Sequence, residues 1–344
     1  MASHRRPKQP SRARVTVLTT AAAAAVAFSA QAANAAPSEK PTKDEVKAKV
    51  DKLYEQAEQA TEKYNGAKEK QEKLQKEIST IQDNVARGQE ELNKLRDSIG
   101  LAAAAQYRTG TIDSSLQLFL SSNPDDYLDK ASTADQLSAQ QVESLKKIQE
   151  KQRELAQERS EASEKLKDLA ATRTELGKKK QEVQAKLAEA QKLLNSLTAA
   201  EKAALDAENA RANRSTGTRV DLGDAPAGSS RAMAAFQAAQ SKLGSPYVYG
   251  ATGPSSFDCS GLTSWAYAQA GVAIPRTSQA QASAGTRIYS QSDLRVGDLV
   301  IFYGDQHHVG FYAGNGQILH APRTGTVVRY ESINNMPFQF GVRI

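Results

Sequence analysis

Apolar positions recur with a seven-residue repeat along much of the chain before residue 200. Between Lys43 and Ile99 the spacing of apolar or small residues alternates between four and three positions. These residues are Val46, Val50, Leu53, Ala57, Ala60, Tyr64, Ala67, Leu74, Ile78, Ile81, Val85, Leu92, Leu95 and Ile99. The alternation is typical of a coiled coil, because it keeps one apolar stripe of a helix facing a partner helix.

A second run of apolar positions extends from Leu145 to Leu197 and keeps the same alternation. Its members are Leu145, Ile148, Leu155, Ala162, Leu166, Leu169, Leu176, Val183, Leu187, Ala190, Leu194 and Leu197. Two such runs separated by a short break favour two helices that return along one another. We therefore predict an antiparallel coiled-coil hairpin over residues 37–212, with a short helical tip near residues 108–125.

The break between the two runs carries its own signals. Tyr107–Thr111 includes a glycine, which often ends a helix, and Pro124 is preceded by cap residues and followed by acids, which predicts a helix start. The segment between them is apolar, with Leu116, Leu118, Phe119, Leu120 and Tyr127. Two interpretations stay open, a cap on the core of the hairpin and a docking surface for a partner.

Residues 1–36 have the pattern of a secretory signal peptide. Basic residues precede an apolar run from Val15 to Ala27, and Ala33–Ala35 offers a small-x-small cleavage site. The apolar run is shorter than the roughly 20 residues that span a membrane, so cleavage near Ala35 is preferred to anchoring. We expect a secreted, extracellular or cell-wall-associated protein.

The formal charge of +6 is concentrated in that leading segment. Its five basic residues and lack of acids leave only +1 on the remainder. A nearly neutral mature chain argues against a nucleic-acid-binding protein, and the Lys and Glu runs along the helices are interpreted as solvated faces.

The heptad pattern stops in residues 213–229, which are rich in Gly, Ser and Pro and are predicted to be a flexible linker. The remaining residues, 230–344, suffice for one compact core. We expect helices over Met233–Leu243 and from Cys259 to about Ala270. Strands are expected at Leu299–Tyr303, His308–Ala313, Gln317–His320, Val327–Tyr330 and Gly341–Ile344. Helices followed by strands predict an α+β domain.

Cys259 is the only cysteine in the chain. A turn precedes it and a helical pattern follows it, so we expect Cys259 at a helix N-terminus, where unpaired N–H groups favour a thiolate. A single cysteine cannot form an internal disulfide, which favours a chemical use of the thiol in an exported protein. The alternative is a small buried apolar residue.

A cysteine nucleophile needs a base, and three histidines follow it: His307, His308 and His320. Strand alternation places His307 and His308 on opposite faces, with Gly310 on the side of His308. Two of the histidines can therefore meet Cys259 from a β-hairpin, with His307 expected at the rim. A metal site and simple core packing are the alternatives, and the alternation disfavours one ion shared by His307 and His308.

Residues from about Arg231 to Ile344 resemble the NlpC-type family of papain-like cysteine peptidases, which cut bacterial cell-wall peptides. The matching motifs are Leu243–Gly250, Phe257–Leu262, Ile274–Gln279, Gly297–Phe302 and the segments around His308 and His320. One departure is Tyr249, at a position where the family commonly has tryptophan.

The resemblance implies Cys259 as nucleophile, His308 as base and His320 as the residue that orients it, without a metal or cofactor. Tyr247 matches a tyrosine that lines the site, and it is a candidate for stabilising the oxyanion. Three further residues are candidates for binding charged ends of the substrate or, equally, for local capping and ion pairs: Asp258, Ser260 and Arg276.

The implied substrate is the stem peptide of peptidoglycan, cut between D-glutamate and diaminopimelate during wall remodelling or cell separation. The alternative is a coiled-coil scaffold or partner-binding protein with an inactive peptidase domain. The complete set of Cys259, His308 and His320 favours the enzyme. We further hypothesise that the hairpin keeps the peptidase inactive or remote until a membrane-protein activator docks on it.

Overall fold

The computed structural model describes residues 42–109, 124–214, 222–223 and 226–344. The predicted signal peptide and the apolar residues Leu116–Leu120 of the predicted tip lie outside these ranges. Among the helices that fall within them, none combines the length and apolar character needed to cross a membrane.

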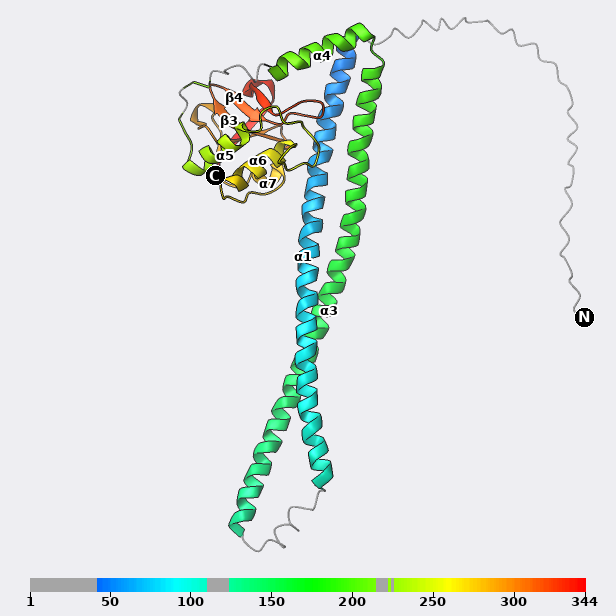
Figure 1. Cartoon of the computed structure of the whole chain (residues 1–344), viewed down its shortest axis with the longest axis vertical. Helices are drawn as coiled ribbons and strands as arrows, with labels where there is room; N and C mark the ends of the chain where they lie inside the picture. The colour runs from blue at the N-terminus through cyan, green and yellow to red at the C-terminus, as the bar shows by residue number, and fades with distance from the viewer. Residues whose placement is uncertain (1–41, 110–123, 215–221, 224–225) are drawn as a thin grey trace, which may run out of the picture. The chain divides into compact units, whose positions relative to one another are not determined.

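Two long helices, α1 (Lys43–Thr109) and α3 (Pro124–Asn195), lie side by side (Figure 1). Residues early in α1 contact residues late in α3, so the two helices run antiparallel. The contacts form three apolar clusters: Val46, Val50 and Leu53 with Ala190; Leu74 and Ile78 with Leu169; and Leu92 with Ile148 and Leu155. The predicted helix pair is confirmed, and α3 begins at the proline that predicted its start.

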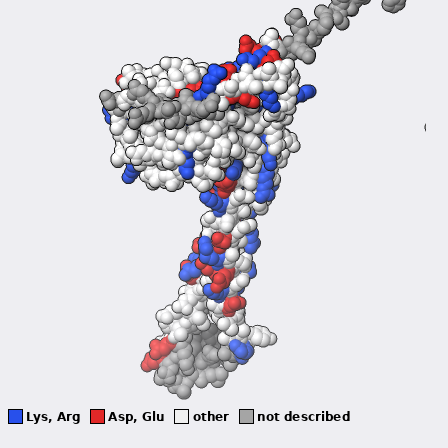
Figure 2. Space-filling view, turned by 45° about the horizontal axis from the view of Figure 1, so that its top comes forward, with Lys and Arg blue, Asp and Glu red and all other residues white. Residues whose placement is uncertain are grey.

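Packing along the seam explains its one glycine. A Cβ atom added to Gly88 would lie 2.8 Å from Cδ2 of Leu155, so the leucine of α3 fills the space that the missing side chain leaves. Ion pairs such as Lys165–Glu77 and Lys151–Glu91 also join the helices, but they remain partly exposed to solvent and add little stability. Figure 2 shows acidic and basic side chains intermixed along the hairpin, as expected for solvated faces.

A third helix, α4 (Ala199–Arg214), follows α3 after a short break. The backbone N–H and the hydroxyl of Thr198 both donate to the carboxylate of Glu201, while the Glu201 N–H donates to the Thr198 hydroxyl. This reciprocal pairing is a capping box, which starts a new helix and ends the seam of α3 near its predicted last residue, Leu197.

The C-terminal domain, residues 226–344, is built from helices followed by an antiparallel sheet. Its helices are α5 (Ser230–Gln240), α6 (Cys259–Gln269) and α7 (Ser278–Gln281). Its strands are β1 (Thr286–Ile288), β2 (Leu299–Phe302), β3 (His308–Gly314), β4 (Gln317–His320), β5 (Arg329–Ser332) and β6 (Phe338–Arg343), with 3-10 turns η1 (Gln291–Asp293) and η2 (Ile333–Asn335). The strand order is β1-β6-β2-β3-β4-β5, and every neighbouring pair is antiparallel. The predicted α+β class is confirmed.

Two features of this domain differ from the sequence-based expectation. Strand β1 was not predicted, because it is only three residues long and exposes two of them. Residues 226–228 belong structurally to the domain, since Gly228 N–H donates to the Val296 carbonyl and Val296 N–H donates to the Pro226 carbonyl, both at 2.9 Å. The ordered chain of the domain therefore includes the last residues of the predicted linker.

Both faces of the sheet are packed. On one face, α5 and α6 bury Phe236, Leu262 and Tyr267 against Phe311, with the rings of Tyr267 and Phe311 stacked 5.7 Å apart. On the other face, a smaller cluster joins Val300, Phe302, Tyr312 and Ile318 to residues of the 3-10 turns and adjoining loops. No residue of α1 belongs to either cluster, so the apolar core of the domain is complete within the domain itself.

Candidate active site

The first residue of helix α6 is Cys259, as the sequence predicts. Asp258 caps the helix, because its Oδ1 accepts a hydrogen bond of 2.7 Å from the Gly261 N–H. Gly261 is required there, since a Cβ atom would lie 2.1 Å from the Ala251 carbonyl oxygen. The thiol thus lies where the helix presents its free N–H groups, and only 1% of Cys259 is exposed.

The two histidines of the site come from the β3–β4 hairpin. Nε2 of His308 and Nδ1 of His320 are 2.7 Å apart, and the two rings meet edge to face. A ring nitrogen of His308 lies within 4.8 Å of the Cys259 sulfur. Helix α6 packs on the Phe311 face of the sheet, not on the face that carries the histidines. Cys259 reaches His308 because that histidine is the first residue of β3.

Glu331 extends this chain of side chains beyond the residues predicted from sequence. Nε2 of His320 lies 3.2 Å from Oε2 of Glu331, and the same oxygen accepts from Arg329 Nε and Nη2 at 3.2 and 2.8 Å. Strand β5 brings Glu331 opposite Ile318, two residues before His320. No sequence motif marks Glu331, and only the register of β4 against β5 reveals it.

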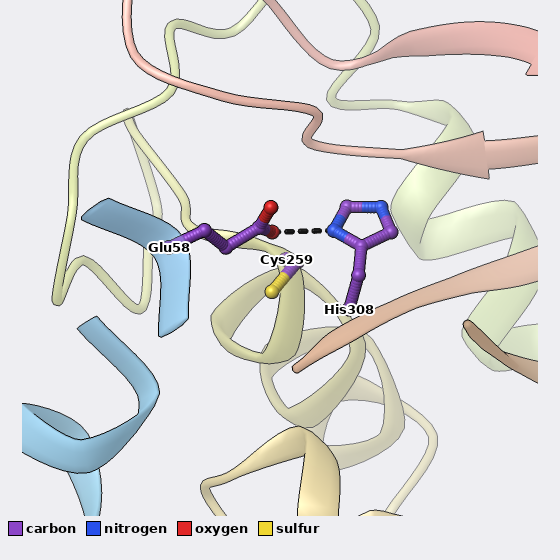
Figure 3. A group of neighbouring side chains, drawn as sticks. All are labelled: Glu58, Cys259 and His308. Atoms are coloured by element: carbon purple, nitrogen blue, oxygen red, sulfur yellow. Dashed lines mark hydrogen bonds and ion pairs between the residues drawn. The ribbon is translucent and has the colours of Figure 1, made fainter. Parts of the chain in front are cut away.

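Three polar side chains of helix α1 also reach the site. Glu58, Glu62 and Asn65 are 7, 2 and 1% exposed. Oε1 of Glu58 is hydrogen-bonded to Nδ1 of His308, the nitrogen on the side of the thiol (Figure 3). The spacing of four and then three residues puts all three side chains on one face of α1.

Glu62 makes the most contacts of the three. Its Oε1 accepts a hydrogen bond of 2.6 Å from the Ser260 hydroxyl and lies 3.7 Å from the Cys259 sulfur. Its Oε2 accepts one of 2.8 Å from the Ser278 N–H at the start of α7. Burial, followed by the negative charge of Asp258, raises the pKa of the Glu62 carboxyl to about 7.

The three residues predicted to bind charged ends of a substrate form one network with α1. Arg276 Nη2 donates to Oδ2 of Asp258 at 2.5 Å, and Arg276 Nη1 donates to the Ser260 hydroxyl at 2.7 Å. Asn65 Nδ2 donates to the same Asp258 oxygen at 3.0 Å. Asp258 therefore has the capping and ion-pairing role that the sequence left open, while Ser260 contacts the carboxylate of Glu62.

Tyr247 and His307 are both buried. Tyr247 is 5% exposed, and burial together with the charge of Glu58 raises the pKa of its phenol well above the usual value. The expectation that His307 lies at the rim is wrong. His307 is 1% exposed, stacks on Tyr303 with ring centres 4.1 Å apart, and is hydrogen-bonded through Nδ1 to Asp305.

The electrostatics of the thiol are opposite to the sequence-based expectation. Burial, and after it the charges of Glu62 and Glu58, raise the pKa of the Cys259 thiol well above its usual value. Burial opposes protonation of His308, but the charge of Glu58 and its hydrogen bond outweigh it and raise the pKa of His308. With α1 in place, Glu58 favours the protonated form of His308, and burial together with the two carboxylates favours the neutral thiol.

Glu58, Cys259 and His308 also place one carboxylate oxygen, one sulfur and one nitrogen within 4.8 Å of one another. Zinc accepts such ligands. Glu58 and His308, however, are bonded directly to each other, and this bond occupies the nitrogen that an ion would need.

A thiol at a helix N-terminus beside a histidine whose second nitrogen is held by another polar side chain is the arrangement of the papain-like cysteine peptidases. The C-terminal domain belongs to the NlpC/P60 family, which residues 244–342 match.

Known relatives share this domain. A "probable endopeptidase" of Corynebacterium glutamicum is 52% identical over 125 residues, which cover 35% of this chain and 59% of the relative. "Probable endopeptidase p60" of Listeria monocytogenes is 49% identical over 98 residues, 28% of this chain and 20% of the relative. This chain thus spans little more than half of the first relative's length.

Two solved structures align with the same region. The NlpC/p60 domain of the peptidoglycan hydrolase SagA is 36% identical and covers 33% of this chain and 98% of that chain, with a TM-score of 0.31. The peptidoglycan hydrolase RipB of Mycobacterium tuberculosis is 32% identical and covers 33% of this chain and 64% of that chain, with a TM-score of 0.30.

Proposed function

We propose that this protein is a secreted peptidoglycan endopeptidase that hydrolyses stem-peptide amide bonds, between D-glutamate and diaminopimelate. The proposal rests on one observation. Cys259 lies at the start of α6, and His308 and His320 lie beside it on the β3–β4 hairpin of an NlpC/P60 domain. The names of the relatives and the secretory pattern of residues 1–36 support the substrate and the compartment.

The chemistry follows from the roles that we assign to these side chains. The Cys259 thiolate attacks the amide carbonyl, a sulfur–carbon bond forms, and His308 Nδ1–H delivers a proton to the departing amine as the carbon–nitrogen bond breaks. Water then attacks the thioester carbonyl and gives a proton to His308. A carbon–oxygen bond forms, the carbon–sulfur bond breaks, and Cys259 leaves as thiolate. His320 holds Nε2 of His308 throughout.

The oxyanion of each tetrahedral intermediate needs donors. The backbone N–H of Cys259 at the start of α6 and the hydroxyl of the buried Tyr247 are assigned this role. Donors of this kind typically contribute roughly 3–4 kcal/mol each to the stabilisation of a transition state.

Digestion of purified bacterial peptidoglycan tests the proposal. The C-terminal domain, which contains its own core, is incubated with the wall, and soluble products are identified by mass spectrometry. We expect fragments that begin with diaminopimelate and fragments that end in D-glutamate. Circular dichroism verifies that the domain is folded, and a folded domain that releases neither product would favour the inactive scaffold instead.

We also propose that a membrane-protein activator binds the hairpin. The support is the exposure of several apolar side chains toward its distal end, including Leu101, Tyr107 and Leu128 at 71, 90 and 61%. Exposed apolar side chains do not stabilise an isolated hairpin, and a bound partner would bury them.

A further inference from the structure

The side chains that close the site come from a helix more than 190 residues earlier in the chain. A helix whose apolar stripe packs on α3 normally leaves its polar face in water. Glu58, Glu62 and Asn65 belong to that polar face, yet at most 7% of each is exposed. The C-terminal domain has therefore replaced water around them, and the hydrogen bonds described above replace the hydration of the two carboxylates and of Asn65 Nδ2, while the buried Asn65 Oδ1 has no hydrogen-bond partner among the described residues.

The approach of α1 to the domain is close over several turns. A Cβ atom on Gly66 would lie 3.7 Å from Thr277, and a Cβ atom on Gly250 would lie 3.1 Å from the Tyr64 ring. The rings of Tyr64 and Tyr249 meet edge to face 6.2 Å apart. Tyr249 is the residue that departs from the tryptophan common in the family, so the departure occurs where the domain contacts its own helix.

The contact continues toward the start of α1. Arg323, in the loop after β4, pairs with Asp51 at 3.1 Å and places its guanidinium 4.5 Å from the centre of the Tyr54 ring. The docked face of α1 therefore extends from Asp51 to Gly66, about four helical turns. Both ends of this face are anchored, and the carboxylates of Glu58 and Glu62 lie between them.

Docking of α1 removes two requirements of catalysis: a free Nδ1 on His308 and access of the substrate to Cys259. Glu58 occupies Nδ1 of His308, the atom that must exchange a proton with the thiol and the leaving group. Glu62 takes the Ser260 hydroxyl and the Ser278 N–H, and its oxygen lies against the sulfur, so a carbonyl group has no path to Cys259. The closed site is blocked both chemically and sterically.

We propose that helix α1 is a built-in competitive inhibitor, in which Glu58, Glu62 and Asn65 occupy the cleft and must leave before a substrate peptide enters. The inhibitor and the site are on one chain, so their effective concentration is on the order of millimolar and even a weak contact keeps the cleft closed. The identity of the substrate that α1 excludes rests on the proposed function, whereas the occlusion of the Cys259 thiol by α1 does not depend on it.

The single cysteine makes the proposal testable without any substrate. The mature chain, residues 37–344, is treated with iodoacetamide, and the alkylation rate of Cys259 is followed by mass spectrometry. The double variant E58K/E62K replaces two buried acids by cations that face Arg276 and His308. We expect its alkylation rate to exceed that of the unmodified chain by about tenfold or more, and its release of wall fragments to rise in parallel.

A matched control is available on the same helix. Asp83 and Asp97 are exposed, and the variant D83K/D97K changes the charge of α1 by the same amount. We expect it to alkylate at the rate of the unmodified chain, with circular dichroism confirming equal helix content in all three proteins. Equal rates for E58K/E62K and the control would overturn the proposal.

The wall assay and the alkylation assay separate the two proposals. Faster alkylation of E58K/E62K without any cleavage of peptidoglycan supports the inhibitory contact and contradicts the proposed function. A chelator that accelerated alkylation of the unmodified chain would contradict direct blockade by α1, because an ion bridging Glu58, Cys259 and His308 would then hold the cleft closed.

A second inference rests on different contacts, those of Glu331. Burial opposes ionisation of Glu331, but its hydrogen bond with His320 and the charge of Arg329 outweigh burial and hold its pKa well below the usual range. Burial lowers the pKa of His320 to about 4, so His320 is neutral at pH 7. An ionised carboxylate only accepts hydrogen bonds, so His320 must carry its single proton on Nε2.

The direction of the remaining bonds follows. His320 Nδ1 is then an acceptor, and the bond of 2.7 Å requires His308 to donate from Nε2. This leaves Nδ1 of His308 as the atom that gains and loses a proton next to the sulfur. We infer that Glu331 is a positioning residue that fixes the tautomers of both histidines.

Substitution of Glu331 tests this inference in the E58K/E62K chain, where the cleft is open. In E331Q a neutral amide oxygen takes the place of the carboxylate oxygen, because Arg329 donates to this position, and without the negative charge it holds the proton of His320 on Nε2 less strongly. We expect kcat to fall about tenfold or more with KM unchanged, a shifted pH profile for alkylation of Cys259, and partial recovery in E331D. An unaltered pH profile, with activity lost only in proportion to a lower melting temperature, would show that Glu331 serves the fold alone.

Discussion

The variant Cys259→Ala is expected to lose cleavage of wall peptides by at least roughly a thousandfold. No second cysteine in the chain replaces the lost nucleophile, and the remaining side chains of the site do not form an acyl intermediate by themselves. The measurement is the rate of release of soluble muropeptides by the isolated C-terminal domain, in which α1 does not mask the result.

The fold is expected to survive this change. Cys259 is a small buried side chain at the first position of α6, and the capping bond from Gly261 to Asp258 does not involve the sulfur. The melting temperature of the alanine variant should therefore stay close to that of the parent domain. Activity above a tenth of the parent in a folded alanine variant would exclude Cys259 as the nucleophile.

His308→Ala is expected to reduce cleavage by roughly a hundredfold to ten-thousandfold, the range associated with loss of a general acid–base group. Nε2 of His308 is hydrogen-bonded to His320, and its Nδ1 lies on the side of the Cys259 thiol. His307 is its neighbour on the chain but bonds Asp305 and stacks on Tyr303. His307→Ala should therefore retain activity within about tenfold of the parent.

Both histidines are buried, so stability must be measured beside activity. We expect His307→Ala to lower the melting temperature, because it removes a buried ring that stacks on Tyr303. The kcat of each variant is compared at a temperature where circular dichroism finds it folded. Equal losses of kcat in the two folded variants would reverse the assignment of the base.

Most of the fold was predictable because its signals are local. The heptad spacing of residues such as Leu74, Ile78 and Leu169 specifies a helix pair, and apolar alternation around His308 and His320 specifies a hairpin. The start of α6 at Cys259 follows from a turn and a cap. Strand β1 has too few residues to show the two-residue alternation of apolar and polar side chains by which a strand is recognised.

The contacts of α1 with the site were not predictable in the same way. Glu58 and Glu62 occupy positions in a heptad where charged side chains usually face water, and nothing in their own neighbourhood distinguishes them from exposed acids such as Asp83. Their burial depends on a domain that begins about 160 residues later. Glu331 was hidden for a related reason, since its proximity to His320 depends on the register of two short strands.

The attachment of helix α1 to the domain that it contacts has a consequence for how the closed state responds to dilution. An inhibitor supplied as a separate molecule dissociates as both partners are diluted, and its effect depends on how much of each is made. Here the ratio is one to one in every molecule, and the fraction of closed sites does not change with concentration. Dilution therefore leaves the site closed, and only an event that acts on the helix itself opens it.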